Sequence, residues 1–539
     1  MTTGSESNIK NSKLSIYAPI VLAVVLALGV FIGSRLGSGG DSSGFLFKSD
    51  PNKLDFILKL IENEYVDTVK KKDLVEKTIP LLLEQLDPHS VYIPARDLKR
   101  VNEPLEGNFD GIGVQFNILN DTLLVVNTVS GGPSEKVGVL PGDKIVTIND
   151  SAFVGKGISN DLVISKLKGE RGSKVKIGVK RSGYKNLLNF EITRDQIPLY
   201  SIDVSYMIDK TIGYIKISAF SRTTYEEFNN AVEKLKMQGM QKMILDLRSN
   251  GGGYLDAAIN IADEFLKDKE LIVYTMGKSR PRTDYRATGK GNFENEKLVV
   301  LIDSWSASAS EIVAGAIQDN DRGVIVGRRS FGKGLVQEPT MFKDGSAVRL
   351  TIARYYTPSG RCIQKSYSNG VQEYDHDLLK RFEHGELENA DSVIIEDTIK
   401  YHTKNGKIVY GGGGIMPDVF VPADTSGLSA FFREISQKSL IYNYALNYTN
   451  QNRDKLNKLG GYREVVKYLE ARNVISDFLN YVRKNGIVAD KNDLSKSEKL
   501  VKTHLYAYIC RNIFDNEGFY PVMMQEDNTL KKAIEVLEK

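Results

Sequence analysis

Short apolar runs alternate with amphipathic helical patterns between residues 212 and 327, and this alternation limits the possible folds more than any other feature of the chain. The expected strands are Gly213–Ile217, Met243–Leu247, Leu271–Thr275, Leu298–Ile302 and Val324–Gly327. The expected helices carry the apolar face Tyr225, Phe228, Val232 and Leu235, or cover Leu255–Leu266 and Ser310–Gln318. Alternation of this kind is typical of an α/β layered domain.

The sequence changes character on both sides of this region. Helical periodicity begins at Leu54 and returns over Leu74–Leu86, where Pro88 follows the second helix. Between Gly107 and Arg194 the chain has short β-type runs separated by Gly and Pro turns, and after Thr425 it has helical patterns again. We therefore expect an α+β multidomain protein, with an inserted β domain and helical N- and C-terminal regions.

Composition excludes several classes of protein. A formal charge of +4 over 539 residues is close to neutral, so we expect no nucleic-acid partner. Two cysteines, Cys362 and Cys510, make no disulfide framework and have no zinc-ligand spacing, and the five histidines form no HExxH motif. We expect no metal and no cofactor.

The first fifty residues contain an uncharged, almost wholly apolar run, Ile16–Ile32, after Lys10 and Lys13. Its length is at the lower limit for spanning a bilayer, and a Gly/Ser-rich stretch follows it. We favour an uncleaved membrane anchor over a cleaved signal peptide, because the run is long and no clear A-x-A site follows. The preceding lysines predict a cytoplasmic N-terminus, with the rest of the chain on the periplasmic side of a bacterial cytoplasmic membrane.

The β-type module begins with Gly111-Ile112-Gly113-Val114, two glycines just before an alternating strand. Successive N–H groups in such a loop can bind a carboxylate, and the neighbouring strand edge can accept an extended peptide. The string from Gly132 to Asn149 resembles the helix, turn and strand of PDZ domains in bacterial proteases. This resemblance implies recognition of a free C-terminus or an apolar peptide end.

The densest chemical signal is Ser304-Trp305-Ser306-Ala307-Ser308-Ala309-Ser310-Glu311, between an expected strand and an expected helix. A serine there has an exposed hydroxyl beside helix N–H groups, which can stabilise an oxyanion. Helix capping accounts for one such serine but not easily for three that alternate with alanines.

A serine nucleophile needs a base, and the sequence offers two candidates. His89 is the one histidine inside a motif, although packing or capping at a helix end explains it equally well. Lys333, between two glycines and before apolar residues, could serve if burial lowers its pKa toward 7.

Several motifs in order resemble the carboxy-terminal processing proteases, also called tail-specific proteases. They are Leu86–Ser90, Asp246–Gly253, Ser306–Glu311, Gly332–Gln337, Ala353–Arg361 and Gly414–Asp418. The resemblance implies a serine endopeptidase with Ser308 as nucleophile, Lys333 as base and Gln337 orienting the lysine. It also implies an oxyanion hole made by the N–H groups of Ala309 and one of Gly252 or Gly253. Asp246 and Arg248 are expected to form a structural ion pair or to hold the glycine loop.

The sequence therefore predicts a protease that binds the C-terminal tail of a protein substrate through its PDZ-like domain. Ser308 would then attack a peptide bond of that substrate. The alternative is a catalytically silent PDZ-bearing adaptor on the same fold. A homodimer or an adaptor protein is a further possible partner. The region after Thr425 could dimerise, bind a partner or extend the core.

The predicted division of the chain has five parts. They are a cytoplasmic tail, anchor and tether (1–50), an N-terminal helical region (51–105), a PDZ-like domain (106–195), the Ser–Lys protease core (196–425) and a C-terminal helical region (426–539).

Overall fold

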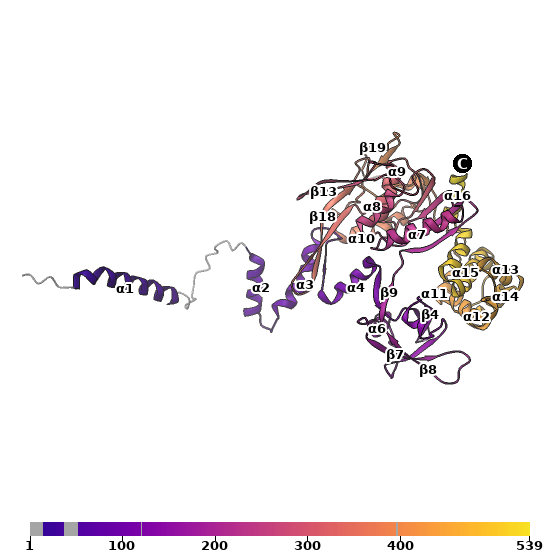
Figure 1. Ribbon diagram of the computed structural model, residues 1–539, viewed down its shortest axis with the longest axis horizontal. Coiled ribbons are helices and arrows are strands. Elements are labelled where there is room, and N and C mark those ends of the chain that lie inside the picture. The colour runs from indigo at the N-terminus through magenta and orange to yellow at the C-terminus, as the bar shows by residue number, and fades with distance from the viewer. Residues whose placement is uncertain (1–13, 37–51, 120, 395–396) are drawn as a thin grey trace, which may run out of the picture. The chain divides into compact units, whose positions relative to one another are not determined.

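The computed structural model describes residues 14–36, 52–119, 121–394 and 397–539 (Figure 1). It separates into two compact units, Met1–Lys77 and Thr78–Lys539. The predicted cytoplasmic tail and most of the Gly/Ser tether lie outside the described residues.

The first unit is helical, as expected. It holds α1 (Leu14–Leu36), α2 (Lys53–Glu64) and the first half of α3 (Lys71–Glu84). The Asn52 side chain caps α2 by accepting a hydrogen bond from the Asp55 N–H.

The predicted membrane anchor is wrong. Within the described parts of the chain, no helix combines the length and the apolar character that crossing a bilayer requires. The apolar run Ile16–Ile32 has 17 residues, whereas a span needs about 20. The periplasmic location inferred from that anchor is overturned with it.

A β module follows β1 (Val91–Ile93) and α4 (Ala95–Glu106). Its main sheet has the order β3-β4-β5-β7-β8, with β6 paired to β5, so β3 forms one edge. The elements of this module are β2 (Asn108–Gly111), β3 (Val114–Leu119), β4 (Thr122–Thr128), α5 (Pro133–Lys136), β5 (Lys144–Ile148), β6 (Ser151–Ala152), α6 (Asn160–Leu167), β7 (Lys174–Lys180), β8 (Leu188–Thr193) and β9 (Asp195–Pro198). Its core includes Leu123, Ile145, Val163 and Val175.

A six-stranded sheet forms the centre of the larger unit, in the order β10-β11-β12-β15-β16-β21. Every neighbouring pair is parallel except β10 with β11. The strands are β10 (Ile202–Met207), β11 (Ile212–Ile217), β12 (Lys242–Asp246), β15 (Lys297–Ile302), β16 (Val324–Gly327) and β21 (Val419–Phe420). The helices between them are α7 (Thr224–Met237), α8 (Leu255–Asp263) and α9 (Ala309–Asp319). The strands and helices expected between residues 212 and 327 are present, with their ends shifted by a few residues.

Both faces of this sheet are covered. Side chains alternate along a strand, so neighbouring residues belong to the cores on opposite faces. Met243 and Leu245 of β12 belong to the core that includes α7, α8 and α9. Ile244, between them, belongs to a separate core that includes residues of the last helix, α16 (Asn528–Glu538). The end of the C-terminal region therefore packs into the core of the six-stranded sheet.

A second, five-stranded sheet has the order β1-β18-β13-β14, with β17 also paired to β18. Its remaining strands are β13 (Leu271–Gly277), β14 (Arg280–Arg286), β17 (Leu335–Met341) and β18 (Ala347–Tyr356). After it come α10 (Val371–Glu383), a short 3-10 turn (Ala390–Ser392), β19 (Lys400–His402) and β20 (Ile408–Tyr410).

The C-terminal region is helical, as expected, and its helices gather around α15 in Figure 1. They are α11 (Ala430–Gln437), α12 (Leu440–Leu456), α13 (Tyr462–Ala471), α14 (Val474–Lys484) and α15 (Lys491–Met523), followed by a 3-10 turn (Met524–Glu526) and α16. Their own core includes Ile435, Leu469, Phe478 and Leu505.

Candidate active site

Three loops carrying the predicted catalytic motifs leave neighbouring strands. Residues 247–254 follow β12, residues 303–308 follow β15, and residues 328–334 follow β16. Because β12, β15 and β16 are adjacent and parallel, their carboxyl ends lie at the same edge of the sheet. In open α/β sheets, ligands bind outside this edge.

Ser308 lies where the loop after β15 turns into α9. Its φ of 55° and ψ of −112° are unfavourable for a residue with a side chain. It is closely packed against the glycine loop, because a Cβ atom added to Gly252 would lie 2.8 Å from the Ser308 Cβ. Backbone strain of this kind gathers at active sites, and it sets Ser308 apart from its neighbours.

The two flanking serines are structural. The buried Ser306 hydroxyl donates to the Leu247 carbonyl at 2.8 Å, and the buried Ser310 hydroxyl donates to the Asn250 carbonyl at 2.9 Å. Both bonds tie the start of α9 to the loop after β12. Ser308, between them, is only partly buried.

The fully buried Glu311 carboxyl connects the Ser308 loop to the Lys333 loop. One oxygen, Oε2, accepts the N–H of Ser308 at 2.8 Å and the N–H of Lys333 at 2.9 Å. The other, Oε1, accepts the Gly332 N–H at 2.7 Å and the Ser330 hydroxyl at 2.5 Å. The backbones of the predicted nucleophile and the predicted base are therefore held by the same atom.

Tyr355, on β18, makes the same connection through carbonyl groups. Its hydroxyl lies 2.6 Å from the Lys333 carbonyl oxygen and 3.2 Å from the Ser308 carbonyl oxygen. The Tyr355 side chain is buried. Glu311 and Tyr355 together hold both loops through donors and acceptors of the main chain.

Burial shifts the pKa values of both titratable groups here. It raises the pKa of Glu311 to about 7, although the hydroxyl of Ser330 and three N–H groups favour the carboxylate. Burial also lowers the pKa of the Lys333 amine, and the positive charge of Arg349 lowers it further. The charges of Glu311 and Asp87 oppose that shift. A lowered pKa is what a lysine needs to act as a base.

Gln337 lies on β17 opposite Thr351 of β18. Its amide nitrogen donates to the Thr351 hydroxyl at 3.2 Å, and that hydroxyl lies 3.1 Å from Asp87 Oδ1. The structure thus places Gln337 in a polar chain with the Asp87 turn. Its predicted action on Lys333 stays a prediction.

His89 contacts a tyrosine, and its pKa is well below the usual value for histidine. Its Nε2 lies 2.8 Å from the Tyr374 hydroxyl, and its N–H donates to Asp87 Oδ1 at 2.8 Å. Burial lowers the pKa of its imidazole to about 4, and the charge of Lys333 acts in the same direction. The ring is therefore neutral at physiological pH and bonded to a tyrosine.

The predicted oxyanion donors lie around Ser308. The Ala309 N–H begins α9 and has no acceptor among the described residues. The Gly252 N–H donates to Asn250 Oδ1 at 2.8 Å, whereas the N–H of Gly253 has no acceptor in the described part of the chain. Of the two glycines, Gly252 has the closer approach to Ser308 and Gly253 has the unused N–H.

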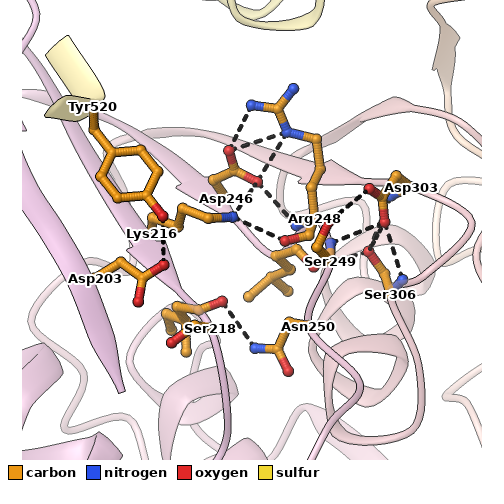
Figure 2. A network of polar contacts seen from close by, with 12 residues as sticks. Asp203, Lys216, Ser218, Asp246, Arg248, Ser249, Asn250, Asp303, Ser306 and Tyr520 are labelled. Atoms are coloured by element: carbon orange, nitrogen blue, oxygen red, sulfur yellow. Dashed lines mark hydrogen bonds and ion pairs between the residues drawn. The ribbon is translucent and has the colours of Figure 1, made fainter. Parts of the chain in front are cut away.

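A largely buried polar network holds the glycine loop (Figure 2). Asp246 is fully buried and pairs with Arg248 at 2.6 Å, which confirms the expected ion pair. Ser249 N–H donates to Asp303 Oδ1 at 3.0 Å, and Asn250 Nδ2 donates to the Ile217 carbonyl at 2.9 Å. The loop is therefore fixed to three neighbouring strands before it reaches Gly252.

The predicted peptide-binding loop lies next to an open strand edge. Gly111 ends β2 and Val114 begins β3, which has β4 on only one side. The Ile112 carbonyl accepts the Ser134 N–H at 3.0 Å, and the Gly113 carbonyl accepts the Val129 N–H at 2.9 Å. Across the described residues, the N–H groups of Ile112 and Gly113 have no acceptor.

Sequence reasoning left two residues of the site without a role. Glu311 stands three residues after Ser308, and this S-x-x-E spacing is a capping-box signal that could have found it. Tyr355 lies inside a recognised motif, but only the strand pairing shows that its hydroxyl reaches Ser308 and Lys333.

Comparison with known proteins matches three segments of the chain. Residues 211–373 match Peptidase family S41, residues 111–192 match the PDZ domain, and residues 431–515 match a family of unknown function, DUF8443. The first two segments contain the site and the open-edged β module.

The similar proteins include carboxy-terminal processing proteases. The carboxy-terminal processing protease CtpB of Bacillus subtilis is 33% identical over 58% of this chain, which spans 65% of the length of CtpB. CtpA of the same organism is 33% identical over 66% of this chain and 75% of its own length. A solved structure, the photosystem II D1 C-terminal processing protease, is 26% identical with a TM-score of 0.36, covering 69% of this chain and 88% of that one. This chain belongs to the carboxy-terminal processing proteases, the serine peptidases of family S41 that carry a PDZ domain.

Proposed function

We propose that this protease cleaves peptide bonds with a Ser308–Lys333 dyad. The observation that carries the proposal is the shared anchoring of the two residues. One Glu311 oxygen accepts both of their N–H groups, and the Tyr355 hydroxyl contacts both of their carbonyl groups. The buried position of Lys333 favours the neutral amine that a general base requires.

In the proposed reaction, the Ser308 Oγ attacks the carbonyl carbon of the scissile bond while its proton moves to the Lys333 amine. A C–O bond forms, and the carbonyl oxygen becomes an oxyanion. The ammonium group of Lys333 then gives its proton to the leaving nitrogen, the C–N bond breaks and an acyl-enzyme remains. A water molecule then attacks the ester carbonyl carbon while Lys333 accepts its proton. The bond between that carbon and Ser308 Oγ breaks, Lys333 returns the proton to Oγ, and the carboxylic acid product leaves.

The oxyanion forms beside the first turn of α9. The free N–H of Ala309 supplies one donor, and the Gly252-Gly253 pair supplies the other. The positive end of the α9 dipole adds to the stabilisation. Gln337, in its chain with Thr351 and Asp87, fixes the surroundings of Lys333.

Labelling with a fluorophosphonate tests the dyad. The wild-type chain and Ser306→Ala should both take up the label, because the Ser306 hydroxyl is bonded to Leu247 and does not react. Ser308→Ala should take up none. Label on the Ser308→Ala protein would overturn the assignment, and absence of label on the wild type would favour the silent adaptor.

We also propose that the PDZ domain binds the C-terminal tail of a protein substrate. An extended tail would pair with the open edge of β3, and its carboxylate would accept the N–H groups of Ile112 and Gly113. Losing those charge-assisted bonds costs on the order of 1.5–3 kcal/mol. A peptide with a free carboxylate should therefore bind roughly ten- to a hundred-fold more tightly than its amidated twin. Equal binding and cleavage of the two peptides would contradict tail recognition.

A further inference from the structure

We infer that Asp527, in the C-terminal region, is a positioning residue that sets the catalytic geometry of the glycine loop by holding Arg248. The inference rests on the proposed function for its catalytic consequence. It concerns a part of the chain that lies outside the S41 and PDZ matches.

The Arg248 guanidinium is divided between two carboxylates. Its Nε and Nη2 donate to Asp246 at 3.0 and 2.6 Å. Its Nη1 donates to both oxygens of Asp527, at 3.0 and 2.8 Å. The Arg248 side chain is only 12% exposed, so these contacts replace water rather than supplement it. Moving Asp527 would therefore move Arg248.

Asp527 also contributes to the charge balance of this network. Asp246 faces two cations, Arg248 at 2.6 Å and Lys216 at 3.8 Å. One carboxylate cannot neutralise both, and Asp527 supplies the second negative charge. Removing one partner from a buried group of charges leaves an uncompensated charge, which is strongly unfavourable.

The main chain of Arg248 passes this restraint to the catalytic loop. Its N–H donates to Asp246 Oδ1 at 2.9 Å, and its carbonyl accepts the Lys216 amine at 2.9 Å (Figure 2). Ser249, the next residue, has a φ of 59° and donates to Asp303. Four residues after Arg248 the chain reaches Gly252, which lies against Ser308. Arg248 is thus the first of the residues that attach the loop to the sheet.

Asp527 is itself firmly placed. It caps α16, because its Oδ1 accepts the Leu530 N–H at 2.6 Å. Leu530 and Leu537 of that helix are buried in the core on the second face of the sheet. Near the end of α15, the Tyr520 hydroxyl donates to Asp203 at 2.7 Å, beside the same network (Figure 2). The C-terminal region therefore contacts the loop through a rigid element.

Asp527→Asn in the full chain separates the ion pair from the cap, because asparagine caps helices as well as aspartate does. The matched control is Asp490→Asn, the same change at the cap of α15, where the side chain accepts only the N–H groups of Asn492 and Asp493 among the described residues. A quenched fluorescent peptide with a free carboxylate measures kcat and KM. Hydrogen exchange followed by mass spectrometry measures the protection of residues 247–254.

For Asp527→Asn we expect kcat to fall about ten-fold or more with KM nearly unchanged, since small displacements of a catalytic group are costly. Exchange in residues 247–254 should become faster, while Asp490→Asn matches the wild type in both measurements. Wild-type kcat, or a loss explained wholly by the unfolded fraction, would overturn the inference. If no variant and no wild type turns over peptide, the dyad is wrong, and exchange alone then decides: unchanged protection of the loop rejects the role of Asp527.

Discussion

At the scale of single residues, Ser308 and Lys333 come from separate loops, and two side chains fix the spacing of their backbones. Glu311 accepts the N–H groups and Tyr355 contacts the carbonyl groups. Neither side chain is expected to react. Contacts to the main chain of Ser308 and Lys333 therefore fix the relative positions of the two residues.

Replacing either member of the dyad should abolish turnover. Ser308→Ala and Lys333→Ala should each lower kcat by roughly 10⁴-fold or more, and the double variant should be barely worse, since the residues act as a unit. Lys333→Arg should also be inactive, because a guanidinium does not lose its proton. Steady-state kinetics on one peptide measures all four proteins.

The controls are the neighbouring serines and His89. Ser306→Ala and Ser310→Ala lose a structural bond and should keep substantial activity. His89→Ala should still turn over, because the neutral ring bonds to Tyr374 and lies outside the proposed proton path. An inactive Ser306→Ala with an active Ser308→Ala would move the nucleophile by two residues.

Glu311 predicts a specific pH dependence. All four of its partners are donors, so the ionised carboxyl fits the site, and it forms only as the pH rises through about 7. Activity should therefore rise with pH between 5 and 8, and the neutral form of Lys333 requires the same direction. In Glu311→Gln the limb near pH 7 should disappear and kcat should be about ten-fold lower.

The free energy of unfolding should fall with rising pH over the interval in which activity rises. Burial raises the folded-state pKa of Glu311 above its ordinary value, so its stabilising contribution is present in acid and is lost as the pH rises toward 7. Urea unfolding at pH 5 and pH 8 should show the wild type losing more stability than Glu311→Gln over this interval. Identical changes in the two proteins would show that this carboxyl does not titrate as described.

The sequence identified the reacting residues better than it identified what holds them. Ser308 and Lys333 stand in distinctive strings, and Glu311 has a local signal in the capping-box spacing. Asp527 has none, because it lies 279 residues after Arg248 and only the folded chain brings them together. The N–H of Gly252 looked available in the sequence, but the Asn250 side chain already accepts it.

At the scale of elements, the loop after β12 shows why its glycines cannot be exchanged freely. Gly252 has a φ of +100°, and a Cβ there would lie 2.8 Å from the Ala307 carbonyl and 3.0 Å from the Ala309 nitrogen. Gly251, one residue earlier, has open space at the same position. The two residues are a matched pair in one loop.

Gly252→Ala should lower kcat by roughly 10²-fold or more, because the added methyl group displaces Ser308 and the Ala309 donor together. Gly251→Ala should remain within a few-fold of the wild type. Kinetics and fluorophosphonate labelling of both variants measure the difference. Equal activity in the two would place the oxyanion elsewhere.

Helices and strands were predictable where the apolar residues of a segment repeat with the period of a helix or of a strand. The strands and helices between residues 212 and 327 are of this kind. The apolar run at Ile16–Ile32 misled for the same reason, since it indicates a helix, and α1 covers it, but it falls short of the length of a span. Sheet order was beyond the sequence, because strand pairing joins distant segments.

At the scale of the whole molecule, α16 makes the C-terminal region inseparable from the protease core. Leu530→Ala should destabilise the entire protease by about 2–5 kcal/mol, the usual cost of emptying a core position. The control Val488→Ala, at a side chain that is 83% exposed, should change stability by less than about 0.5 kcal/mol. Urea unfolding followed by tryptophan fluorescence of Trp305, beside the site, measures both. A wild-type midpoint for Leu530→Ala would contradict this dependence.

The position of α16 also has a consequence for biosynthesis. A ribosome makes Ser308 and Lys333 more than 190 residues before Leu530 and Leu537, and one face of the catalytic sheet stays uncovered until those leucines emerge. A nascent chain cut before residue 530 should carry every dyad residue and still lack a finished core. The two dyad residues are thus synthesised well before the residues that complete the second face of their sheet.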